Sequence, residues 1–170
     1  MRVKTTLLAA LAALVSVSAS AGDYGDIKNS ILPPPNKGIL KSADIGVFGM
    51  YLFDSDDFSD TYGYGGSLGW KINNLIGLKT EYWYAPEPQL HNAALNAVLQ
   101  IPVGDTLSVR PFIGVGFLAN NNVRGLGQAG IDLLWSPQGS RWALGAGYRY
   151  VYVDGRSDYQ GTTLGIEISF

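Results

Sequence analysis

The chain has 170 residues, with 22 glycines, no cysteine, 12% aromatic residues and a formal net charge of −2. The small net charge argues against nucleic acid or an anionic surface as the main partner. Without cysteine, stability cannot come from disulfides. Frequent glycine and aromatic residues with short polar punctuation favour many short strands.

The first 21 residues have the features of a secretory signal peptide. Arg2 and Lys4 precede an apolar run at 7–15, and small residues follow at 19–21. The run is well short of the ~20 residues that a membrane-spanning helix needs. We therefore expect residues 1–21 to be cleaved off.

Residues 22–42 form a segment of different composition, with three prolines at 33–35. Consecutive prolines cannot donate ladder hydrogen bonds and favour an extended polyproline conformation. We expect an N-terminal extension outside the folded domain. A partial plug of that domain's interior is the alternative.

From Ala43 onward the residue pattern has period two, which is typical of strands. It recurs in eight segments, at 43–53, 62–72, 75–84, 92–101, 107–118, 126–135, 141–152 and 160–170. One face of these segments is apolar and uncharged. The opposite face holds most of the glycines and a set of charged residues: Asp44, Lys71, Lys79, Glu81, Arg110, Asp132, Arg149 and Glu167.

Either a soluble sandwich or barrel, or a transmembrane barrel, could bury this pattern. The glycines favour placing the mixed face inside a narrow barrel, where they leave room for neighbouring side chains. Aromatic residues gather at the two ends of the apolar face, as they do at the two interfaces of a bilayer. They are Tyr51, Tyr62, Tyr64, Tyr82, Tyr84, Tyr148, Tyr150 and Tyr152 at one end, and Trp70, Trp135 and Trp142 at the other.

The sequence thus predicts an all-β fold, an eight-stranded antiparallel up-and-down transmembrane barrel over residues 43–170. Closure is required because lipid cannot satisfy an open strand edge. The inward charges balance, so we expect a closed, salt-bridged lumen with a central network around Lys79, Glu81, Arg110 and Arg149. A narrow ion channel gated by these charges is the alternative. Pro111, within the fifth strand, should cause a bulge.

The last residues carry a resemblance. Thr163, then Gly165, then alternating apolar residues through Ile168 to a final Phe170 resemble the C-terminal sorting signal of bacterial outer-membrane barrels. Together with the signal peptide and the strands, the chain from Ala43 resembles the small OmpA/OmpX-like barrels. This resemblance implies a bacterial outer-membrane location and recognition by the barrel assembly machinery. It also implies contact with outer-membrane lipids and lipopolysaccharide. We expect the protein to be a monomer.

An enzyme is the rival class, because the lipid A deacylases and palmitoyltransferases are small barrels with a catalytic histidine. The single histidine, His91, has Ala93 where the deacylase pattern has serine. Without a nucleophile beside it we expect a loop histidine and no catalysis. The acidic segment 54–60 lacks the spacing of a calcium loop. We expect no metal or cofactor, and a structural or interaction protein.

Overall fold

The computed structural model describes residues 42–53, 60–87, 89–155 and 158–170. The signal peptide, almost all of the N-terminal extension and most of the acidic segment lie outside the described residues. The strands are β1 (Ala43–Phe53), β2 (Thr61–Lys71), β3 (Ile76–Ala85), β4 (Leu90–Leu99), β5 (Ile101–Val103), β6 (Leu107–Asn120), β7 (Asn122–Trp135), β8 (Trp142–Val153) and β9 (Tyr159–Ser169). No helix in the described ranges is long and apolar enough to span a membrane.

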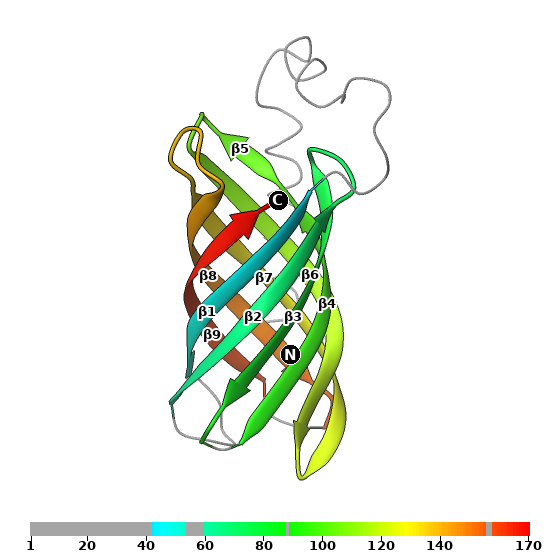
Figure 1. Cartoon of the computed structure of the whole chain (residues 1–170). Coiled ribbons are helices and arrows are strands. Elements are labelled where there is room, and N and C mark those ends of the chain that lie inside the picture. Colours follow the sequence, from blue (N-terminus) through cyan, green and yellow to red (C-terminus); the bar gives the residue numbers. More distant parts are fainter. Residues whose placement is uncertain (1–41, 54–59, 88, 156–157) are drawn as a thin grey trace. The chain divides into compact units, whose positions relative to one another are not determined.

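The strands form one closed antiparallel barrel (Figure 1). Sequence neighbours pair around the wall, β1 pairs with the last strand β9, and β4 pairs with β6. β5 follows β4 after a single residue and also pairs with β6, so the two occupy one position in the wall. The predicted eight-stranded up-and-down barrel is confirmed.

The bulge expected at Pro111 is not present. β4 pairs with β6 as far as Val98 opposite Phe112, and β5 resumes at Ile101 opposite Val109 in the same register. A bulge would shift the register by one residue. Instead the ladder is interrupted at Leu99 and Gln100, opposite Pro111 and Arg110. Proline has no N–H to donate there.

The β6–β7 hairpin is longer than expected. The sequence predicted a connection at 119–124, whereas only Asn121 separates the two strands and Asn120 pairs with Asn122. Asparagine tolerates the backbone of a tight turn and bonds locally; here the Asn121 N–H donates to the Asn120 side chain. The strands can therefore pair to their very tips.

The two ends of the barrel differ. Ala43 and Phe170 lie at one end, where the Phe170 N–H donates to the Ala43 carbonyl at 2.9 Å; we call this the terminal end. The tyrosines gather at the other end, which we call the tyrosine end. Side chains alternate between lumen and exterior along each strand, and the apolar face points outward as predicted.

Inside the tyrosine end lies an apolar layer that the alternation of polar and apolar residues does not predict. It consists of Met50, Leu52, Trp83, Ala85, Leu90, Ala94, Leu118, Leu126, Val151, Val153 and Tyr159. These side chains come from every long strand except β2. This apolar layer therefore fills the lumen at the tyrosine end.

Glycines let the strands approach the large lumen side chains. A Cβ on Gly130 would lie 2.6 Å from a ring carbon of Phe112, and one on Gly165 would lie 2.7 Å from Cβ of Phe48. Both distances are far below van der Waals contact. The glycines on the inner face thus make room for Phe48 and Phe112, as the sequence suggested.

Candidate functional site: an ion-paired lumen below an apolar layer

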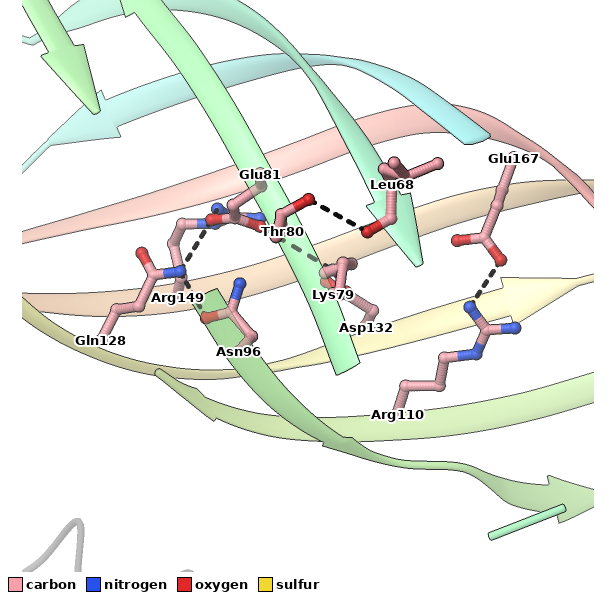
Figure 2. Close-up of polar contacts among 10 residues, drawn as sticks. All are labelled: Leu68, Lys79, Thr80, Glu81, Asn96, Arg110, Gln128, Asp132, Arg149 and Glu167. Atoms are coloured by element: carbon pink, nitrogen blue, oxygen red, sulfur yellow. Dashed lines mark hydrogen bonds and ion pairs between the residues drawn. The ribbon is translucent and has the colours of Figure 1, made fainter. Parts of the chain in front are cut away.

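Glu81 is the centre of the lumen network (Figure 2). It is 4% exposed on β3 and forms an ion pair with Arg149 on β8, which is 2% exposed. The Gln128 amide on β7 donates to Glu81 Oε1 at 2.8 Å and to Asn96 Oδ1 on β4 at 2.7 Å. Four strands are therefore joined across the lumen by side chains alone.

Lys79 extends this network toward the terminal end. Its ammonium lies 2.6 Å from Asp132 Oδ2 on β7 and 3.9 Å from Glu81 Oε2. Lys79 also lies over the Phe112 ring at 5.0 Å, and the Arg149 guanidinium lies 5.5 Å from the Phe48 ring and 5.6 Å from Phe112. Buried cations are stabilised when both carboxylates and aromatic faces surround them.

Arg110, which we expected in the central network, pairs with Glu167 on β9 instead, at 2.6 Å. Figure 2 shows this pair apart from the cluster around Glu81. The Lys71 ammonium lies 3.6 Å from Asp44, which also accepts a hydrogen bond from the Ser169 hydroxyl at 2.6 Å. All the predicted inward charges thus face the lumen, but they form a central cluster and two separate pairs.

Exposure of the ion pairs rises toward the terminal end. The side chains of Arg149 and Glu81 are 2% and 0% exposed, whereas Lys71 at the terminal end is 27% exposed. A lumen cavity of about 50 Å³ is lined by Lys79, Asp132, Arg149, Glu167 and several glycines. A second, of about 30 Å³, is lined by both outer ion pairs. Such volumes hold a few water molecules and no larger ligand.

The apolar layer closes the lumen on the opposite side of the central cluster. Leu52, Leu90 and Leu118 are at most 1% exposed. The rings of Trp83 and Tyr159 meet edge to face at 6.1 Å. Water and ions in the polar half of the lumen therefore meet a packed apolar barrier before the tyrosine end.

The residues expected at the membrane interfaces point outward. Tyr62, Tyr64, Tyr82, Tyr148 and Tyr152 are exposed at the tyrosine end, and Trp135 and Trp142 at the terminal end. Tyr51, Trp70, Tyr84 and Tyr150 share these faces and are partly covered. In the final strand, Ile168 and Phe170 point outward and Thr163 and Gly165 face the lumen.

We expected His91 to lie in a loop, but it lies on a strand. It is the second residue of β4, and its side chain is exposed on the outer face. Its Nδ1 is 2.7 Å from the Tyr82 hydroxyl, and its ring is 4.5 Å from the Tyr84 ring. The described residues contain no group of three or more histidine, cysteine, aspartate or glutamate side chains that could hold a metal ion.

No family model matches the sequence, and no curated protein matches it. Solved structures do. The N-terminal β-barrel domain of Pseudomonas aeruginosa OprF aligns with a TM-score of 0.59 and 18% identity over 76% of this chain and 97% of that one. A de novo designed transmembrane β-barrel aligns with a TM-score of 0.54 and 17% identity over 82% and 99%.

The Yersinia pestis outer-membrane protein Ail, solved in a phospholipid bilayer nanodisc, aligns with a TM-score of 0.50 and 13% identity over 75% and 99%. At these sequence identities the similarity shows only that the folds are alike. One of the similar barrels is a design without a natural role. The chain therefore has the fold of the small eight-stranded transmembrane β-barrels.

Proposed function

We propose that this protein is an integral outer-membrane barrel of structural or interaction type whose lumen does not conduct. Its outer face meets lipid, its terminal end faces the periplasm, and its tyrosine end faces outward. The barrel assembly machinery and the lipids of the outer membrane are the partners that this placement requires. The similarity to Ail, an outer-membrane protein, supports the location.

The outer face of the described strands supports the membrane placement. It carries no lysine, arginine, aspartate or glutamate. Val47, Val115 and Leu164 are each at least 64% exposed on it. A water-facing sheet would not expose so many large apolar side chains, whereas a lipid-facing one does.

The apolar layer is the observation that carries the proposal of a closed lumen. A gate built from ion pairs could open by exchanging partners, but exchange around Glu81 leaves Leu52, Leu90 and Leu118 in place. Ions would still have to cross a packed, mainly apolar layer, which costs several kcal/mol or more. The ion pairs are thus better suited to stabilising the barrel than to gating it.

Conductance measurements test this proposal. The mature protein is refolded, inserted into planar bilayers and compared with a Glu81→Ala variant. We expect no discrete openings from either, because the variant breaks the central network without opening the apolar layer. Openings of the native protein that change in Glu81→Ala would favour the gated narrow channel instead.

A lipid-modifying enzyme is the weaker candidate. Such an enzyme would need a nucleophile or an acid beside His91. The described contacts of its ring are with Tyr82 and Tyr84. These contacts provide neither the nucleophile nor the acid that acyl transfer needs. An unchanged mass of lipid A in cells that overproduce the protein is the expected result.

A further inference from the structure

Asn92 is a polar residue inside the apolar layer. It is the third residue of β4, it points into the lumen between Leu90 and Ala94, and it is 0% exposed. Trp83 on β3 is paired with it on one side, and Leu118 on β6 is paired with it on the other. All four of these neighbours belong to the layer. An amide is therefore buried among apolar side chains.

The Asn92 amide has no hydrogen-bond partner among the described residues. This is true of its Oδ1 and of its Nδ2, and also of the indole Nε1 of Trp83, which is 0% exposed as well. Folded proteins satisfy nearly all such groups, because a buried donor or acceptor without a partner has lost its hydration and gained nothing. Where protein groups do not supply the partner, an ordered water molecule commonly does. Asn92 and Trp83 therefore require a hydrogen-bonding molecule within the layer.

Glu81 connects this part of the layer to the central cluster. It is paired with Ala94 across β3 and β4, so it is a diagonal neighbour of Asn92 on the inner face. Diagonal neighbours of this kind are roughly 7–8 Å apart, which one bridging molecule can span. Oε2 of Glu81 also has no hydrogen-bond partner among the described residues, and it lies 3.9 Å from the Lys79 ammonium. Asn92 and Glu81 are thus placed to share one bridging molecule.

The chemistry of these groups identifies the bridging molecule. Asn92 offers a donor and an acceptor, Trp83 offers a donor, and Glu81 offers an acceptor. An anion would be repelled by the Glu81 carboxylate, and a cation would compete with Arg149, which already pairs with that carboxylate. An apolar molecule would leave the amide unsatisfied. Water is small and neutral, and it both donates and accepts hydrogen bonds.

We propose that Asn92 binds internal water within the apolar layer, in contact with Trp83 Nε1 and Glu81 Oε2. The site is closed toward the tyrosine end, because Ala85 and Leu90, one inward position nearer that end, are both 0% exposed. Bound water at Asn92 is therefore compatible with a lumen that does not conduct. The inference goes beyond the proposed function, because it depends on the barrel but not on its orientation or its partners.

NMR of the native barrel is the first test. The mature protein is labelled with ¹⁵N and refolded in maltoside micelles, and the signals of Asn92 and Trp83 are assigned from the spectra of Asn92→Leu and Trp83→Phe. Cross-relaxation with water protons is then measured in the rotating frame, where direct contact and chemical exchange give opposite signs. We expect direct contact at the Asn92 amide and at the Trp83 indole N–H. A folded native barrel without contact at either group would overturn the inference.

Three substitutions then test whether Asn92 holds the water. Asn92→Leu has a similar size but no hydrogen-bonding group, so the contact of water with the Trp83 indole should be lost. Asn92→Ser keeps a donor and an acceptor and should retain the contact. Leu118→Met, at the position paired with Asn92, controls for repacking of the layer and should retain it too. Contact that persists in Asn92→Leu would overturn the inference.

Stability gives an independent readout in lipid vesicles. If the Asn92 amide had no partner at all, Asn92→Leu would raise the urea midpoint, because it would remove an unsatisfied polar group. With bound water we expect the midpoint to stay the same or to fall, because Trp83 and Glu81 lose their partner. A higher midpoint would therefore overturn the water site. Discrete openings in planar bilayers would overturn the closed lumen and leave these results unaffected, so the two failures are distinguishable.

Discussion

Arg149 and Glu81 form an ion pair across the lumen between β8 and β3, at the boundary between its polar and its apolar half. On one side lie the remaining ion pairs, and on the other lies the layer that includes Leu52 and Trp83. When two opposite charges are buried against an apolar core, removing one of them leaves the other buried and unpaired, which is strongly destabilising. This dependence gives the first prediction.

Glu81→Ala should destabilise the barrel by about 3–5 kcal/mol, because Arg149 then stays buried without its carboxylate. The double variant Glu81→Leu with Arg149→Leu should lose less than Glu81→Ala, because it leaves no unpaired charge. Urea unfolding of the protein in lipid vesicles, followed by Trp fluorescence, measures both. A double variant less stable than Glu81→Ala would show that the pair itself supplies the stability.

The apolar layer should behave as the core of the protein. Leu52→Ala removes a fully buried side chain and should cost about 2–5 kcal/mol in the same unfolding assay. Leu164→Ala, at a position 70% exposed on the outer face, serves as the control. It should cost less, because lipid chains fill the space that the side chain leaves. Equal costs would contradict a packed layer inside the lumen.

Two glycines of β7 should respond oppositely to alanine. A Cβ on Gly130 would lie 2.3 Å from the Tyr148 carbonyl oxygen, whereas one on Gly125 would meet nothing within 4 Å. Gly130→Ala should therefore destabilise the barrel or prevent refolding. Gly125→Ala should be neutral or stabilise it by about 0.4–1 kcal/mol. Similar unfolding midpoints for the two variants would be the contrary result.

Phe170 should matter more for assembly in cells than for the folded state. Its ring is 66% exposed on the outer face, so Phe170→Ala removes little internal packing. We expect the variant to refold in vitro nearly as well as the native chain. In producing cells, the amount of heat-modifiable barrel in the envelope should fall several-fold, as seen by cold electrophoresis. Loss of refolding in vitro would assign Phe170 a structural role instead.

Much of the fold could be predicted from the sequence because one face of each strand is uncharged. The alternation of charged and apolar residues around Lys79, Arg110 and Glu167 predicted both the strands and the inward direction of these three side chains. The length of the β6–β7 hairpin could not be predicted in this way. Asn120, Asn121 and Asn122 are typical of a loop, yet two of them pair in the ladder.

The apolar layer escaped prediction for a related physical reason. At the tyrosine end both faces are apolar: Leu52 lies between Tyr51 and Phe53, and Trp83 between Tyr82 and Tyr84. Polarity does not alternate there, so only parity along the strand marks these residues as inward. The sequence also could not predict which charged residues form ion pairs with each other. Arg110 and Glu167 are 57 residues apart, and their meeting depends on the stagger of strands around the closed wall.

Reaction of single cysteines tests most directly whether the apolar outer face meets lipid. The native chain has no cysteine, so Val115→Cys on the outer face and Gly139→Cys in the β7–β8 turn can each be labelled selectively. Each variant is refolded into lipid vesicles and exposed to a water-soluble maleimide, before and after the vesicles are dissolved in detergent. If the barrel spans the membrane, Val115→Cys is protected in intact vesicles, while Gly139→Cys reacts wherever the reagent has access to its side of the membrane. Equal and rapid labelling of both in intact vesicles would contradict a transmembrane barrel.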